Sequence, residues 1–115
     1  MPVEVPPVSY LDALIEALRA VGRHLEVTRR WLSSAEEEDG SPAWRLQALA
    51  AARAEHAEAT AWLAIACARL IDLGDDLPAA LAPLPARLDA MRADLQSAED
   101  RLLCIAASTR PLGHG

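Results

Sequence analysis

The 115-residue chain contains no lysine, no asparagine and no phenylalanine, and all of its 11 basic residues are therefore arginine. The codons of the three missing residues are rich in A and T, so their joint absence indicates a GC-rich bacterial genome rather than a chemical requirement. The net charge is −6 and the arginines form no cationic stripe, whereas a protein that neutralises phosphates needs one. Direct binding of nucleic acid is therefore disfavoured.

Signals for export or membrane insertion are also missing from the sequence. The opening residues lack the cationic and apolar segments of a signal peptide, and the longest apolar run, Ala59 to Ala68, is too short to span a bilayer. We therefore expect a cytoplasmic protein with no membrane partner. In that reducing compartment, Cys67 and Cys104 are expected to be free thiols that behave as small buried apolar side chains.

Leucine recurs at every seventh residue in two stretches, and each stretch has a second, mainly apolar row three positions further on. The first stretch contains Leu11, Leu18, Leu25 and Leu32 with Leu14, Val21 and Thr28, and the last contains Leu81, Leu88, Leu95 and Leu102 with Leu84, Met91, Ala98 and Ile105. Residues seven apart return to nearly the same face of a helix. Each stretch therefore predicts a helix with one heptad seam of the coiled-coil kind.

Capping residues predict where the helices begin and end. Ser9 with Asp12 resembles a capping box, Ser41 followed by Pro42 is typical of a helix start, and Gly74 is typical of a helix end. No segment alternates as a strand does. The predicted elements are a proline-rich extended lead-in at 1–8, helices at about 9–34, 42–73 and 84–108, and a flexible tail at 109–115.

Short connections between helices of similar length are typical of antiparallel neighbours. The sequence therefore predicts a single all-α domain, an antiparallel up-down-up bundle of three helices over residues 9–108 with heptad seams.

The middle helix differs from the other two because its second half is apolar on nearly every side, whereas a helix in a monomeric three-helix bundle keeps a polar face. Two explanations stay open. Alanine is common in this chain and harmless in water, or the helix packs against a second copy or a partner protein, most simply as a C2 homodimer. The predicted interface comprises Ala50, Ala54, Ala57, Ala61, Trp62, Ala64, Ile65 and Ala68.

Trp31 and Trp44 flank the connection between the first two helices. We expect the two rings to pack together over this turn. If they are exposed instead, they are candidates for anchoring a partner.

Polar residues interrupt the seams in the middle of the bundle and define a candidate polar belt. Antiparallel pairing of the first two helices sets residues whose numbers add to about 78 opposite one another, which brings His24 near Arg53 and His56. Either Glu55 or Glu99 is expected to supply a carboxylate to the same layer. Polar groups in a seam need partners, so the belt either fixes the register or forms a site.

As a site, the belt could take two forms. Two histidines and a carboxylate can hold Zn²⁺ or Fe²⁺, and Arg53 with a histidine as acid or base could form an anion pocket. Glu55 and His56 lack the Glu-x-x-His spacing of di-iron bundles, and no phosphate loop, nucleophile elbow or zinc-protease motif occurs. The sequence therefore predicts no cofactor and no catalytic residue.

Three hypotheses of function follow. The first is a small protein-interaction module, such as an adaptor, a regulator or an accessory subunit, which is homodimeric and acts through the middle helix or the tryptophan end. The second is a small helical-bundle enzyme or a metal or anion site at the polar belt. The third is an acidic mimic of nucleic acid that inhibits a nucleic-acid-binding protein through the acidic run Glu36 to Asp39.

Overall fold

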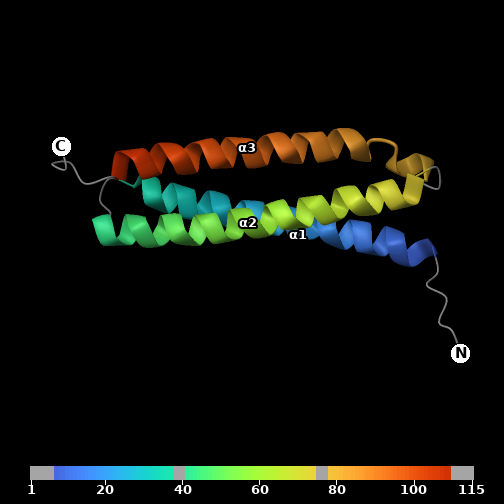
Figure 1. Cartoon of the computed structure of the whole chain (residues 1–115), viewed down its shortest axis with the longest axis horizontal. Coiled ribbons are helices and arrows are strands. Elements are labelled where there is room, and N and C mark those ends of the chain that lie inside the picture. The colour runs from blue at the N-terminus through green and yellow to red at the C-terminus, as the bar shows by residue number, and fades with distance from the viewer. Residues whose placement is uncertain (1–6, 38–40, 75–77, 110–115) are drawn as a thin grey trace, which may run out of the picture.

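The computed structural model describes residues 7–37, 41–74 and 78–109, and this part of the chain is all-helical and contains no strand. Its long helices are α1 (Pro7–Glu36), α2 (Pro42–Leu73) and α3 (Leu84–Thr109), with the short 3₁₀ helix η2 (Ala79–Leu81) between the last two. Figure 1 shows the three long helices lying lengthwise beside one another. None of the described helices has a stretch that is both long enough and apolar enough to cross a bilayer.

The start of α1 differs from the prediction. The helix begins at Pro7, so Ser9 lies in its first turn and is not the N-cap. Proline suits the first turn because its fixed φ is helical and it has no N–H that needs a partner. The predicted lead-in is therefore too long by two residues, and the rest of it lies outside the described residues, as does the tail beyond Thr109.

Both ends of α2 follow from local chemistry, as predicted. The Ser41 hydroxyl accepts a hydrogen bond from the backbone N–H of Trp44 at 3.1 Å, and Pro42 occupies the first helical position. At the other end, Gly74 has a φ of +48° and its N–H donates to the carbonyl of Leu70. This left-handed φ favours glycine because a Cβ would be strained there. The two caps fix the length of α2.

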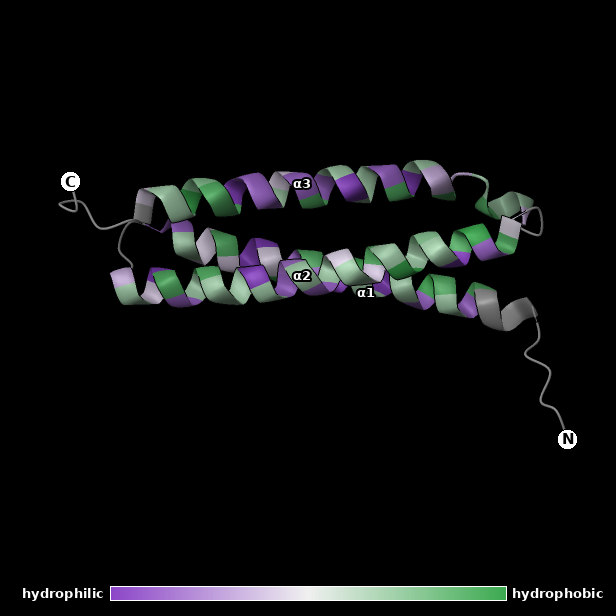
Figure 2. Cartoon of the chain, viewed as in Figure 1, coloured by the Kyte–Doolittle hydropathy of each residue, from purple (hydrophilic) through white to green (hydrophobic). Residues whose placement is uncertain are grey.

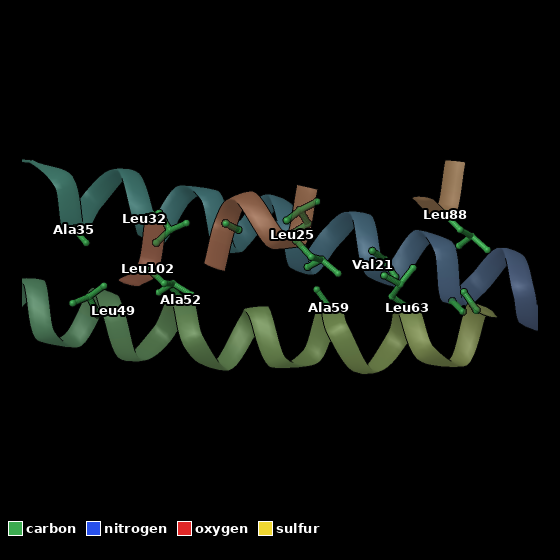
Figure 3. Close-up of a cluster of buried hydrophobic side chains, with 14 of the residues drawn as sticks. Val21, Leu25, Leu32, Ala35, Leu49, Ala52, Ala59, Leu63, Leu88 and Leu102 are labelled. Carbon is green, nitrogen blue, oxygen red and sulfur yellow. The ribbon is translucent and has the colours of Figure 1, made fainter. Parts of the chain in front are cut away.

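The predicted leucine rows of α1 and α3 supply most of the large buried side chains. Leu14, Val21 and Leu32 of α1 have no exposed surface, and Leu88, Leu95 and Leu102 of α3 are at most 5% exposed. Figure 3 shows side chains of α1 and α2 pointing toward one another, with Leu88 and Leu102 reaching in from α3. The most extensive contact is between α1 and α2, and many of the residues between them are alanines, whose small side chains allow two helices to approach closely.

Candidate protein interface

One face of α2 is buried in this core. Ala52, Ala59 and Ala66 have no exposed surface, and Leu49 and Leu63 beside them are at most 5% exposed. We call this side the inward face of α2. It is the side that α1 and α3 cover.

The opposite side of α2 is open to solvent. All six alanines of the predicted interface are exposed. Each of them lies two positions from one of the buried alanines Ala52, Ala59 and Ala66. Because a helix has 3.6 residues per turn, a step of two residues turns the side chain by about 200°, which places these alanines opposite the inward face. We call this side the outward face of α2, defined by Ala50, Ala54, Ala57, Ala61, Ala64, Ala68 and Ile71.

Large apolar side chains lie on or beside the outward face. Ile71 is 77% exposed, Leu46 is 61% exposed and Ile65 is 40% exposed. Trp62, which the sequence placed in the same interface, is half-buried and packs against the core instead. Figure 2 shows the second half of α2 mainly in green shades, whereas much of α3 is purple. Part of the most apolar helix is therefore left uncovered.

An open groove of about 990 Å³ lies between α2 and α3 and is continuous with the outward face. Ala57, Ala61 and Ala64 line its α2 side, and Arg92 and Glu99 line its α3 side. The Arg92 guanidinium donates to Cys67 Sγ at 3.3 Å and so joins the two walls. The groove widens the apolar surface that α2 presents.

The candidate polar belt is divided between two helix pairs. His24 Nδ1 donates to the Glu55 carboxylate at 2.5 Å, between α1 and α2. His56 Nε2 donates to the backbone carbonyl of Leu95 at 2.9 Å, between α2 and α3. Because Glu55 and His56 are consecutive, their side chains leave α2 about 100° apart. The sequence suggested that His24 and His56 meet in one site. The structure instead directs them to different neighbours.

The other members of the belt are exposed. Arg53 makes no hydrogen bond or ion pair with any described residue, and Glu99 lines the α2–α3 groove beside His56. Thr28, the buried polar residue of α1, donates its hydroxyl hydrogen to the carbonyl of His24 at 2.7 Å. That bond within one helical turn satisfies Thr28 without a partner from another helix.

No group of three or more His, Cys, Asp or Glu side chains in the described part of the chain is placed to hold a metal ion. Two belt residues, His24 and Glu55, share a short hydrogen bond at the edge of the α1–α2 interface. Their side chains are 26% and 30% exposed, so water reaches the pair.

The tryptophans at the α1–α2 connection pack together, as predicted. The ring centroids of Trp31 and Trp44 are 5.8 Å apart and the ring planes are inclined at 52°. Such tilted pairs are a favoured aromatic geometry. Trp44 keeps 39% of its surface exposed, so a role in anchoring a partner stays a prediction.

Both cysteines are free, but their surroundings differ from the expectation of burial. Cys67 is half-buried and Cys104 is exposed. The expectation is wrong for Cys104 because Leu102 and Ile105 take the inward positions of α3, so Leu103 and Cys104 between them fall on its outer side.

Two ion pairs between α1 and α3 were not foreseen. Arg101 binds the Glu36 carboxylate through two nitrogen atoms, and Arg29 lies 3.6 Å from Asp94. In both pairs the α3 residue lies 65 positions after its α1 partner. This repeated spacing of opposite charges is the signal that could have been used to align the two helices.

Comparison with protein-family models, with curated proteins and with solved structures found no match. The candidate interface therefore rests on the geometry of this chain alone.

Proposed function

We propose that the chain is a small cytoplasmic protein-interaction module, an adaptor, regulator or accessory subunit, that acts through the outward face of α2 and forms a homodimer there. One observation carries the proposal: the outward face is apolar over most of the length of α2 and is exposed, although α2 is the most apolar helix of the chain. Apolar faces of this extent on small proteins commonly mark binding surfaces.

We further propose that the chain forms an antiparallel up-down-up bundle with heptad seams. In both ion pairs between α1 and α3 the residue numbers differ by 65. A constant difference is expected when two neighbouring helices run in the same direction, because both numbers then rise together. Two contacts join α2 and α3: His56 with Leu95, and Cys67 with Arg92. From the first contact to the second the residue number rises in α2 and falls in α3, which favours antiparallel neighbours.

Energetics support a partner at the outward face. Burying an isoleucine side chain fully contributes about 1.5–3 kcal/mol, and Ile71 has most of its surface still to bury. The alanines around it let another helix approach to the short end of the usual 8–10 Å separation, where backbones and side chains pack densely. A second copy offers the same surface and closes the assembly with two-fold symmetry.

The test is to place a charge in the middle of the outward face. In native mass spectrometry we expect the natural chain to be a dimer and Ala61→Arg to be a monomer, because the interface would bury an unpaired guanidinium. The helical circular dichroism should be unchanged, since Ala61 is exposed in the single chain.

The matched control is Ala93→Arg, the same change at an exposed position of α3, which should remain a dimer. If Ala61→Arg stays assembled, the outward face is not the working surface and the proposal fails.

The other two hypotheses of function gain no support from the geometry. A site at the polar belt needs its members to converge, and His24 and His56 hydrogen-bond to different helices. An acidic mimic depends on the run from Glu36 to Asp39, of which residues 38–39 lie outside the described residues.

A further inference from the structure

The exposed apolar residues of α2 follow their own heptad repeat. Ala54, Ala61 and Ala68 are seven apart. A second row at the same spacing, Ala50, Ala57, Ala64 and Ile71, alternates with them along the helix. Alternate spacings of three and four residues are typical of a helix that packs along one seam against another helix, as in a coiled coil. The rows of α1 and α3 with this spacing are mostly buried, whereas this one is exposed.

The two flanks of this repeat carry different residues. One flank has Leu46, Arg53, Thr60 and Cys67, and the other has Ala51, Glu58, Ile65 and Asp72. The Arg53 and Glu58 side chains are exposed and make no ion pair or hydrogen bond with the residues that the structure describes. The flanks of a coiled coil select the partner and its direction through charge.

We infer that the outward face of α2 binds α2 of a second copy, parallel and in register, as a two-stranded coiled coil. This inference rests on the proposed function and specifies its partner. In a parallel pair, a residue on the first flank meets the residue five positions later on the other flank of the partner. Arg53 then faces Glu58 of the partner subunit, and the two-fold axis repeats this opposite-charge pair.

The same arrangement covers the large apolar side chains that the single chain leaves exposed. Ile71 meets Ile71 of the partner subunit in the last core layer. Leu46 lies over Ala51 of the partner subunit, and Ile65 lies beside Thr60 of the partner subunit. Three of the exposed large hydrophobic side chains of the chain, at 61%, 40% and 77% exposure, are covered by one interface.

Antiparallel pairing lacks this complementarity. In an antiparallel pair each flank faces the same flank of the other copy. The flank with Arg53 and the flank with Glu58 then lie on opposite sides of the seam, so these two residues cannot meet. In an antiparallel pair Glu58 therefore faces a residue of its own flank, which is Ala51, Glu58, Ile65 or Asp72 of the other chain. None of these residues offers the Glu58 carboxylate a positive charge, and Asp72 is ion-paired with Arg69 of its own helix.

Cysteine cross-linking tests the direction. Ala50→Cys and Ala64→Cys are made separately in a Cys67→Ser, Cys104→Ser background and oxidised gently. Both should give disulfide-linked dimers, because each position faces itself in a parallel pair. The two positions lie about 21 Å apart along the helix, and a disulfide needs Cα atoms within about 7 Å, so antiparallel pairing links at most one of them. Ala93→Cys in the same background is the control and should give only background cross-linking.

Charge exchange tests the register. Arg53→Glu or Glu58→Arg should each raise the dimer dissociation constant roughly tenfold, because two attractive contacts become repulsive. The double variant Arg53→Glu, Glu58→Arg should return it to near the natural value. Arg23→Glu, an equal charge change on the exposed side of α1, should leave it unchanged. Absence of rescue in the double variant overturns the inference.

The outcomes separate the inference from the proposed function. Cross-linking at one position only, in a dimer that Ala61→Arg dissociates, overturns the parallel pairing and leaves the outward face as the interface. Both the inference and the proposed interface are overturned if the dimer survives Ala61→Arg and neither cysteine position gives a cross-link. A monomeric natural chain overturns the inference and the homodimer, and leaves the outward face as a surface for a different protein.

Discussion

The two faces of α2 are built from the same residue at the same spacing. Ala52, Ala59 and Ala66 are seven apart and fully buried, whereas Ala54, Ala61 and Ala68 are also seven apart and exposed. The rows are only two positions out of phase. The difference lies in what the other helices place against each row, so alanine content alone does not tell a core face from a free one.

The comparison also separates two uses of a small side chain. On the inward face, alanine lets α1 approach closely, and the volume around it is filled by leucines such as Leu32 and Leu63. On the outward face, alanine leaves a smooth exposed surface that borders the α2–α3 groove. The same methyl group is a packing element in the first case and a place for a partner in the second.

The largest effect is expected from removing a side chain that fills the space around the inward face. Leu32→Ala should lower the free energy of unfolding by about 2–5 kcal/mol, because Leu32 has no exposed surface and leaves a cavity. Leu103→Ala, at a leucine 61% exposed on α3, should change it by less than about 0.5 kcal/mol. Urea denaturation followed by circular dichroism measures both. Equal losses would contradict the placement of the core.

A second, smaller effect compares the two faces directly. Ala59→Leu should lower the free energy of unfolding by about 1–3 kcal/mol, because three extra carbons do not fit between α1 and α2. Ala61→Leu should change it by less than about 0.5 kcal/mol when measured at a concentration at which the chain is monomeric. If the exposed position proves the more sensitive of the two, the assignment of the faces is reversed.

The smallest effect concerns the pair at the α1–α2 edge. A double-mutant cycle with His24→Ala and Glu55→Ala should give a coupling free energy within about 1 kcal/mol at neutral pH, because both side chains are partly in water. Chemical denaturation of the four proteins measures it. A coupling of several kcal/mol would mean that the pair is a major element of the fold rather than a minor contact at its edge.

Much of the fold follows from local sequence signals. Ser41, Pro42 and Gly74 fix both ends of α2 through their own hydrogen bonds and backbone preferences, and the leucine rows identify the buried sides of α1 and α3. The start of α1 was less predictable because Pro7 and Ser9 are both acceptable in or before a first turn.

The candidate site was harder to predict because it depends on rotation as well as register. The predicted alignment set His24 opposite residues near position 54, and the structure pairs it with Glu55. A shift of one residue changes the height on the helix little but turns the side chain by about 100°, enough to point His56 toward α3 instead of α1. A heptad pattern predicts the rotation of a helix about its axis when leucine marks only one side. In α2 alanine occurs on two sides, so the pattern does not predict which side is buried.

The aromatic side chains give α1 and α2 optical properties that α3 lacks. The three tryptophans lie in α1 and α2, the one tyrosine lies in α1, and α3 has no aromatic residue. Near-ultraviolet absorption and fluorescence therefore originate from α1 and α2 alone, where Trp31 and Trp44 are in ring contact. Far-ultraviolet circular dichroism records all three helices. Together the two signals distinguish the detachment of α3 from the separation of α1 and α2 without any added dye.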